Sequence, residues 1–296
     1  MKIDTPTKIL VRRRGALGDV VMSTGVVREL HRTRKNLLIT VETDYPLVYN
    51  NNPHVAEICN WGETNLADYD VVYNLDDAYE ANPENHFVNS MFYRVFGDNT
   101  THMLKSADLH VTDADRDIVD ADLASIGSKF FVVHMRNWHW ALKNIDISTW
   151  LDIFVKVFET TVDYKIVTVG GETDFSLDHP LIFNANNRYT PQQLAYLIDH
   201  AKCFVGIDSA PFQIAAATDT HVIGLLTHNP PEYIMPLRHL DTMWHATAIQ
   251  ANVDCVGCNV LQKRPIRGIM CSKGDFPCAR TWDTDKIAAA ILEQLK

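Results

Sequence analysis

Segment 203–226 constrains the fold more than any other part of this chain. It is typical of a buried strand over Cys203–Ile207, a tight turn, a helix of small residues and a second buried strand over 222–226. Continuous apolar runs between turns indicate parallel strands whose two faces are covered by helices. Asp208 and Ser209 follow the first strand, at the edge of such a sheet where ligands bind. They either cap the helix or contribute to an anion site.

The rest of the chain alternates strands and helices in two series, which predicts an α/β protein with parallel sheets. The first series has strands at 8–12, 37–42, 55–58 and 70–75, and helices at 20–32, 45–51, 85–96 and 113–126. The second has strands at 130–134 and 164–169, helices at 147–161 and 190–200, the unit at 203–226 and a last helix at 284–295. We expect two Rossmann-like domains, residues 1–126 and 127–296, that face each other across a cleft.

The net charge and the distribution of apolar residues limit the kinds of partner that this chain is expected to bind. The 296 residues carry a formal net charge of −10, so a broad electrostatic grip on a nucleic acid or an anionic membrane is not expected. No apolar run reaches the length of a membrane span, and the first residues do not resemble a signal peptide. We therefore expect a soluble, cytoplasmic chain, with peripheral contact to a membrane-bound acceptor at the inner membrane face as the alternative.

A glycine-containing loop, residues 13–19, follows the first strand. Gly15 and Gly18 let the backbone approach a ligand or another segment closely. The loop is neither a G-x-G-x-x-G fingerprint nor a P-loop, which argues against a plain dinucleotide or triphosphate site. Asp19 is either a cap that matches the helix dipole or a carboxylate held at the ligand edge. Two domains that face each other would place this loop opposite 208–210.

Four motifs occur in a characteristic order along the chain. They are RGALGDVVMSTGVVREL at 14–30, Lys143 seven residues before Trp150, Gly-Gly-Glu at 170–172, and VGIDSAPFQIAAATDTHVI at 205–223. Together they resemble the signatures of glycosyltransferase family 9, the lipopolysaccharide heptosyltransferase family, over nearly the whole chain. The resemblance implies a GT-B fold with an acceptor-side N-terminal domain and a donor-binding C-terminal domain. It also implies inverting, metal-independent transfer of a sugar from a nucleotide-diphosphate donor to an acceptor hydroxyl.

The resemblance assigns roles to individual residues. Asp19 matches the catalytic aspartate, a general base that takes the proton of the acceptor hydroxyl. Lys143 and the helix start at Ser209 would stabilise the leaving diphosphate without a metal ion. Glu172 would accept from a ribose hydroxyl, and Asp208 would order the phosphate-binding turn. The implied donor-binding set is Gly18, Arg136, Lys143, Gly171, Glu172, Asp208, Ser209, Ala210 and Gln213.

The chain departs from the family pattern in three places. Ala210 replaces the usual glycine, and Gln213 replaces the usual histidine and cannot carry a proton. Either the donor contact is altered or the donor is not a heptose. The segment before Lys143 is longer and more aromatic than the family segment. We expect its aromatic residues to pack the domain interface, with stacking on a sugar or base face as the alternative; they are Trp138, His139 and Trp140.

Cysteine usage is uneven along the chain. Cys59 and Cys203 lie in apolar, strand-like segments and are expected to be inert. The other four are spaced C-x2-C-x12-C-x6-C near the C-terminus, a pattern compatible with a structural zinc site although its last spacing is wide; they are Cys255, Cys258, Cys271 and Cys278. A cytoplasmic location argues against stable disulfides. No cofactor is expected for catalysis itself.

Other functions remain as alternatives to a glycan transferase. A DNA-base glycosyltransferase of the phage type is one, because a local basic loop offsets the overall acidity; it contains Lys263, Arg264, Arg267 and Lys273. A GT-B nucleotide-sugar epimerase is another, but it needs an acid–base pair at the sugar, and only Asp19 stands out. A non-catalytic nucleotide-sugar binding protein would not need Asp19 at all.

Overall fold

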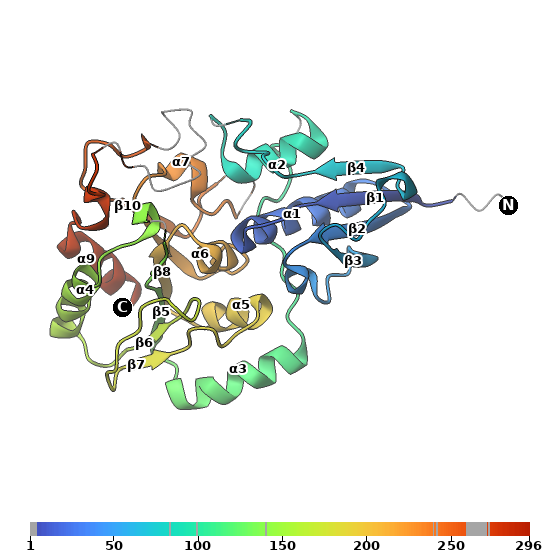
Figure 1. Cartoon of the computed structure of the whole chain (residues 1–296). Coiled ribbons are helices and arrows are strands. Elements are labelled where there is room, and N and C mark those ends of the chain that lie inside the picture. The colour runs from blue at the N-terminus through green and yellow to red at the C-terminus, as the bar shows by residue number, and fades with distance from the viewer. Residues whose placement is uncertain are drawn as a thin grey trace.

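Two separate parallel sheets form the framework of the protein, and together with their helices they make two lobes (Figure 1). The computed structural model describes residues 5–82, 84–98, 100–139, 141–238, 240, 242–258, 271 and 273–296. The first sheet has the strand order β3-β2-β1-β4. Its strands are β1 (Thr7–Arg12), β2 (Leu37–Thr43), β3 (Glu57–Asn60) and β4 (Val71–Asn74). All its pairings are parallel, as the alternation of strands and helices predicted.

The second sheet has the order β10-β9-β8-β5-β6-β7, again with parallel pairings throughout. Its strands are β5 (Phe130–His134), β6 (Lys165–Thr168), β7 (Ile182–Asn184), β8 (Cys203–Ile207), β9 (His221–Leu226) and β10 (Ala246–Gln250). Every residue of β5 and β8 is buried, because helices cover both faces of these central strands. The sequence did not predict β7 or β10, which are short edge strands with few buried residues.

Helices cover both sheets and join the lobes. They are α1 (Leu17–Thr33), α2 (Phe87–Phe96), α3 (Asp113–Ile126), α4 (Ile147–Thr160), α5 (Pro191–Asp199), α6 (Ala210–Ala215), α7 (Pro231–Ile234) and α9 (Thr284–Gln294). Short 3-10 turns occur at η1 (Pro46–Tyr49), η2 (Leu66–Asp68), η3 (Ala141–Lys143) and η4 (Pro277–Ala279). None of the helices in the described part of the chain is long and apolar enough to span a membrane.

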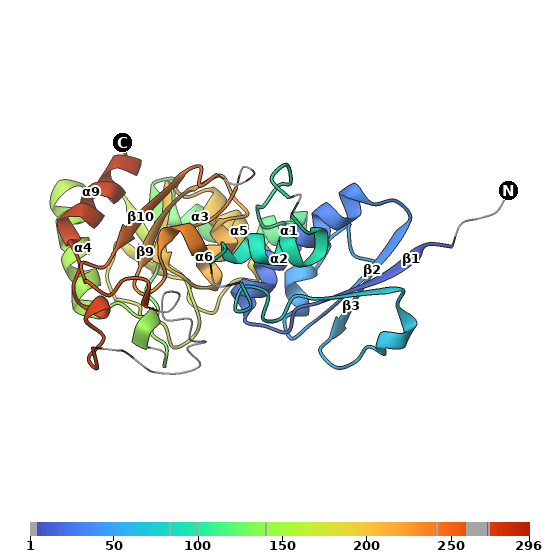
Figure 2. The same ribbon diagram turned by 90° about the horizontal axis from the view of Figure 1, so that it is seen from above.

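The lobes meet along helices rather than through a sheet. Figure 2 shows α1 and α2 of the first lobe beside α6 of the second. The Gln192 side chain, on α5, donates to the backbone oxygens of Leu47 and Val48 at 2.9 and 3.1 Å. His86 Nε2 lies 2.8 Å from the backbone oxygen of Met235, which joins α2 to the end of α7. The carboxyl edges of both sheets therefore face the same junction.

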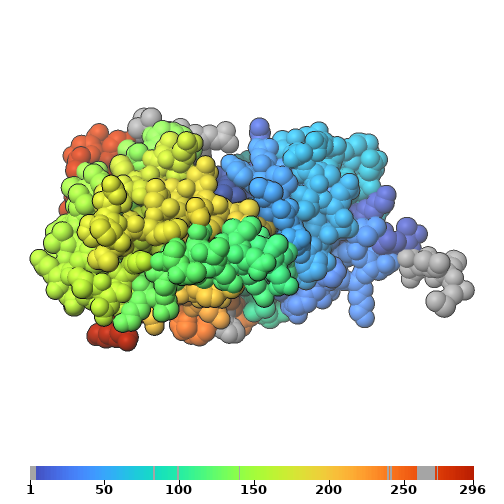
Figure 3. All heavy atoms as spheres, turned by 90° about the horizontal axis from the view of Figure 1, so that it is seen from below, coloured from blue at the N-terminus to red at the C-terminus, as the bar shows by residue number. Residues whose placement is uncertain are grey.

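Helix α3 carries the chain from the first lobe to the second and lies across their boundary (Figure 3). It begins at a Thr112 cap and ends at Gly127, whose φ of +87° favours glycine, so the predicted bounds 113–126 are confirmed. Asp122 anchors the helix to the second lobe. Its carboxylate accepts from Arg188 Nε and from the Tyr189 hydroxyl, both at 2.6 Å. The Arg188 guanidinium and the Tyr189 hydroxyl hold the pKa of Asp122 below its usual range, against the opposing effect of burial.

We predict that Asp122→Asn lowers the free energy of unfolding by about 1.5 kcal/mol at neutral pH, the lower end for a hydrogen-bonded charge because Arg188 is half exposed. A carboxyl with a lowered folded-state pKa stabilises the protein above its unfolded pKa and loses that contribution as the pH falls through the folded value. Urea denaturation should therefore show that the difference in the free energy of unfolding between the variant and the native chain becomes smaller below about pH 4. Asp117→Asn, at an exposed position of the same helix, is the control and should unfold as the native protein does. A difference that is independent of pH would contradict the assignment.

Candidate functional site

Asp19 lies in the first turn of α1, directly after the glycine-containing loop. Its Oδ2 accepts from the Ala16 backbone N–H at 3.0 Å and lies 2.7 Å from a terminal nitrogen of Arg13. Its Oδ1 accepts from the Tyr79 hydroxyl at 3.2 Å. The side chain is 17% exposed. Asp19 thus caps the helix and also presents a partly accessible carboxylate at the sheet edge, so the two interpretations of the sequence are compatible.

Two buried side chains that the sequence did not single out hold this carboxylate. Arg13 also donates to the backbone oxygen of Leu75 at 2.8 Å. Burial opposes its charge, but Asp19 outweighs that effect and the pKa of Arg13 is raised. The Tyr79 ring stacks on Phe87 at 4.1 Å between centroids. Burial, and then Asp19, hold the pKa of Tyr79 well above its usual value, so the hydroxyl remains a donor to Asp19.

The two glycosyltransferase-like motifs meet at Gly18. A methyl group on Gly18 would lie 3.3 Å from Ala210 Cα and 3.4 Å from Ala210 N, on the facing helix α6. Gln213 is 3% exposed and lies against the same glycine. Its Nε2 is buried, with no hydrogen-bond partner among the described residues. The loop at 13–19 therefore faces 208–210, as the sequence predicted.

Asp208 follows β8 and is buried beneath the turn. Lys143 Nζ donates to its Oδ2 at 2.7 Å, and Asn229 Nδ2 does so at 3.1 Å. Burial raises the pKa of Asp208, but the charge and hydrogen bond of Lys143, together with His228 and Arg136, outweigh burial, so the pKa is lowered overall. Burial and the same lysine lower the pKa of the adjacent His228 to about 4, so this imidazole is neutral. An internal ion pair thus fixes the turn after β8.

Ser209 belongs to a chain of side chains that extends away from the turn. Its Oγ lies 2.8 Å from His134 Nδ1, and His134 Nε2 lies 2.9 Å from Asp174 Oδ2. Asp174 also accepts the backbone N–H groups of Gly171 and Asn137, each at 2.8 Å. Burial lowers the pKa of His134 and Asp174 raises it, with burial the larger effect. The three side chains connect the carboxyl ends of β5, β6 and β8, and the sequence did not indicate His134 or Asp174 as site residues.

The remaining predicted donor residues lie around this turn. Arg136 is half-buried near Asp208 and Asp174, and burial lowers the pKa of its guanidinium overall. Gly171 and Glu172 are exposed beside Asp174. Trp138 is 45% exposed and contacts Arg136 and His139, so the expected packing of this indole in the domain interface is wrong. Trp140 lies outside the described residues.

The cysteine quartet lies around η4, where Cys278 packs against Leu142, the neighbour of Lys143. None of these four cysteines forms a disulfide in the described part of the chain, and Cys278 is buried. Burial and the neighbouring Cys258, Cys255 and Cys271 raise the pKa of Cys278 to about 12. Within the described ranges the four sulfurs do not form a group with all ligand atoms within 4.8 Å, so the structure does not support the expected zinc site. Cys203 is buried and Cys59 half-buried, each in a strand.

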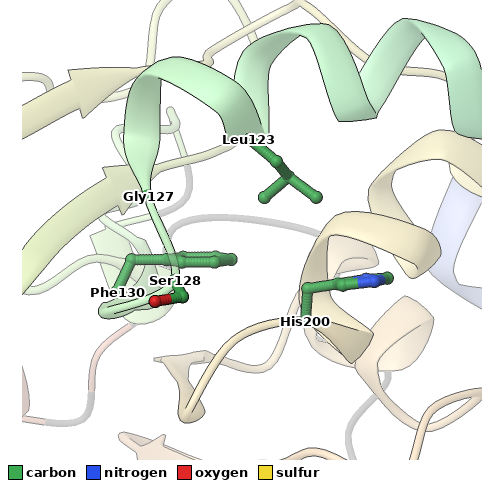
Figure 4. A pocket seen from close by; sticks show the side chains of 5 residues that line it. All are labelled: Leu123, Gly127, Ser128, Phe130 and His200. Atoms are coloured by element: carbon green, nitrogen blue, oxygen red, sulfur yellow. The ribbon is translucent and has the colours of Figure 1, made fainter.

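Two further features do not contribute to the site. A small apolar pocket of about 240 Å³ lies between the ends of α3 and α5 (Figure 4); it is lined by Leu123, Gly127, Ser128, Phe130 and His200. It adjoins the start of β5, whereas the site adjoins the end of that strand at His134. In the predicted basic loop, Lys263, Arg264 and Arg267 lie outside the described residues, and Lys273 pairs with Asp254 at 3.0 Å.

Comparisons with known proteins agree with this geometry. Residues 184–263 match the profile of glycosyltransferase family 9 (heptosyltransferase). A glycosyltransferase of family 9 from Veillonella parvula superposes with a TM-score of 0.75 at 14% identity, over 100% of this chain and 98% of that one. ADP-heptose lipopolysaccharide heptosyltransferase II of E. coli gives 0.66 at 15% identity, over 98% of each chain. Iron-containing TibC of enterotoxigenic E. coli, in complex with ADP-D-β-D-heptose, gives 0.70 at 13%, over 98% of this chain and 77% of TibC.

These matches decide three of the sequence predictions. No curated protein sequence matches the chain. The profile match confirms the resemblance to glycosyltransferase family 9 and, with it, the assignment as a glycosyltransferase enzyme. The structural likeness, at identities of 13–15%, shows the fold, which is the GT-B fold that the motifs implied.

We predict that Gly170→Ala destabilises the protein by about 1–3 kcal/mol, because Gly170 has a φ of +149° and a Cβ there would collide with the Asp174 carboxylate and His134. Gly171→Ala is the matched control. Its φ is not in the left-handed range, and the new methyl would lie 3.8 Å from Asp174, an ordinary contact. Thermal unfolding of both variants checks the prediction. Equal melting temperatures for the two would show that the turn does not hold Asp174 as described.

Proposed function

We propose that this protein transfers a sugar from a nucleotide-diphosphate donor to an acceptor hydroxyl, with inversion at the anomeric carbon of the sugar. The proposal starts from the match of residues 184–263 to glycosyltransferase family 9 and from the GT-B fold of the chain. Asp19 is the general base, and no divalent metal takes part in the chemical step. The observation that carries the proposal is the partly exposed Asp19 carboxylate, fixed by Arg13 opposite the turn at Ser209.

The two oxygens of Asp19 have different surroundings, and this supports its role. Oδ2 receives both the Arg13 guanidinium and the Ala16 N–H, whereas Oδ1 receives only the Tyr79 hydroxyl, at the longer distance of 3.2 Å. Oδ1 therefore keeps a lone pair for the acceptor hydroxyl. As the acceptor oxygen attacks the anomeric carbon, its proton passes to Asp19 and the bond to the diphosphate oxygen breaks on the opposite face. Arg13 and Tyr79 hold the carboxylate in place throughout.

The leaving diphosphate needs positive charge and N–H donors at the facing turn. The residues proposed for donor binding surround that turn: Gly18, Arg136, Lys143, Gly171, Glu172, Asp208, Ser209, Ala210 and Gln213. The charge of Lys143 is balanced by Asp208, and this ion pair fixes the turn. The half-buried guanidinium of Arg136 is less closely paired with Asp208 and Asp174, so it supplies the positive charge for the diphosphate. Glu172 is exposed and accessible to a ribose hydroxyl.

The donor is proposed to be a nucleotide-diphosphate heptose or a close relative. TibC is in complex with ADP-D-β-D-heptose, and the E. coli enzyme is named for ADP-heptose. Ala210 and Gln213 alter the donor contact relative to the family pattern, which favours a sugar that differs from the usual heptose at this contact. The acceptor is proposed to be a glycan or another hydroxyl compound, bound on the side of residues 1–126, with the donor on the side of residues 127–296.

The four clustered cysteines are proposed to hold a structural metal ion. The other three thiols are near enough to Cys278 to raise its pKa, which supports this, and binding of zinc or iron would require the four sulfurs to come closer together. TibC is described as iron-containing. The proposed role of the ion is structural: it would hold the η4 region, which packs against Leu142, and it has no assigned part in sugar transfer.

We predict that Asp19→Asn lowers turnover by roughly 10²-fold or more while donor affinity stays close to the native value, and that the melting temperature falls because buried Arg13 loses its counter-ion. The amide keeps the shape of the side chain but cannot accept a proton. Initial rates with a nucleotide-sugar donor and calorimetric donor binding measure the two effects. Asp76→Asn is the matched control, because Asp76 also lies near Arg13, at 3.7 Å, yet is not the proposed base. Native turnover in Asp19→Asn would leave Asp19 as a helix cap only.

We further predict that Lys143→Ala weakens nucleoside-diphosphate binding by about 1.5–3 kcal/mol, the typical contribution of a charge-assisted hydrogen bond, because the phosphate-binding turn loses the Lys143–Asp208 bond that fixes it. The substitution also leaves Asp208 buried without its cation, so the double variant Lys143→Ala/Asp208→Asn separates binding from stability. Calorimetry should find both variants weakened, with the double variant recovering melting temperature. Native affinity in both would contradict the placement of the diphosphate at this turn.

A further inference from the structure

A cluster of imidazoles and one carboxylate lies on the first lobe, outside the proposed catalytic site. His54 follows η1, and Asp108 and His110 belong to the segment that runs from α2 to α3. Their ligand atoms all lie within 4.8 Å of one another. His31, near the end of α1, is 12 residues beyond Asp19, or about 18 Å along the helix axis. The cluster is therefore a separate site at the opposite end of α1.

The geometry points to a metal site: we propose that His54, Asp108 and His110 bind a divalent transition-metal ion of the zinc class. Two imidazole nitrogens and one carboxylate oxygen make up a common set of protein ligands for zinc, with water in the fourth position. Bonds of about 2.0–2.2 Å in tetrahedral geometry place ligand atoms about 3.3–3.6 Å apart. Asp108 Oδ2 lies 3.5 Å from His54 Nε2 and 3.0 Å from His110 Nε2, close to that spacing.

His31 supports the tautomer of His54 that such a site requires. His54 Nδ1 lies 3.1 Å from His31 Nδ1. When Nε2 of His54 binds a metal, its proton is on Nδ1, and that N–H can donate to the lone pair of His31. Metal-bound histidines generally use their second nitrogen in this way. His31 is therefore a positioning residue rather than a ligand.

The backbones that carry the ligands are held before any ion binds. The His54 N–H donates to Asn52 Oδ1 at 2.9 Å, and the Asp108 N–H donates to Thr24 Oγ1 at 2.8 Å. A terminal nitrogen of Arg28 lies 3.7 Å from Asp108 Oδ1, which leaves Asp108 Oδ2 to face the two imidazoles. The ion would cross-link the turn after η1 to the segment that enters α3, and would stabilise the native state in proportion to its occupancy.

The experiment compares chelator-treated native protein with single variants by calorimetric titration of Zn²⁺ and by metal content after dialysis. The native protein and the His102→Gln variant should each bind one more equivalent of Zn²⁺ than the His54→Gln variant or the His110→Gln variant. His102 is exposed in the same connecting segment and serves as the matched control. Cys258→Ser distinguishes this ion from one held by the cysteines, because it should leave the histidine-dependent equivalent in place. Equal stoichiometry in the native protein, His54→Gln and His110→Gln would overturn the proposal.

Substitutions at His31 test the positioning role. His31→Leu removes the acceptor and should raise the dissociation constant by roughly 10–100-fold, the usual cost of an outer-shell partner. His31→Gln keeps an oxygen acceptor and should remain near the native value. Should a ligand variant fail to fold, imidazole NMR signals of the native protein give the same answer. Zn²⁺ should shift the signals of His54 and His110 but not those of His102, and an absence of such shifts would contradict the site.

Discussion

The close approach of Gly18 to Ala210 is the contact on which the proposed site depends. It brings the start of α1 close to the start of α6, since a methyl group at position 18 would lie 3.3 Å from Ala210 Cα, tighter than an ordinary contact. Each helix start follows a central strand of its own sheet, β1 or β8, so the contact joins the carboxyl edges of both lobes. Asp19 and Ser209 flank the contact on opposite sides. The two lobes therefore meet at Gly18, which has no side chain to keep the two backbones apart.

Charge is balanced within each lobe before a ligand arrives. Asp19 pairs with Arg13 and Asp208 with Lys143, whereas Asp174 is held by hydrogen bonds to His134 and to backbone N–H groups. Carboxylates so close to a proposed diphosphate would repel it if they were unpaired, because like charges interact strongly where water is largely excluded. The internal pairs instead hold the turns and leave the backbone N–H groups, with Arg136, to face the cleft. This arrangement explains why acidic residues can surround a site for an anionic donor.

The fold could be predicted from local patterns to a large extent. The bounds of α3 followed from a Thr112 cap and a glycine at 127, and β8 followed from a continuous apolar run. The edge strands β7 and β10 were missed because short, half-exposed strands give little apolar signal.

The site was predicted in part. The residues carried by motifs, Asp19 and Ser209 among them, do come together. Their partners were missed because they are distant in sequence: Tyr79 is 60 residues from Asp19, and His134 is 75 from Ser209. The zinc site stays a prediction for a different reason, since spacing along the chain does not fix how four sulfurs are arranged in space. Side chains that contact a site only after the chain has folded leave no local pattern in the sequence.

A crystal structure of the protein with a non-transferable nucleotide-diphosphate sugar would test the central claim most directly. The account predicts that the diphosphate contacts the Ser209–Ala210 turn and Arg136, and that the anomeric carbon faces Asp19 Oδ1 with space between them for an acceptor hydroxyl. A donor bound with its anomeric carbon turned away from Asp19, or a diphosphate held at another edge of the second sheet, would contradict it.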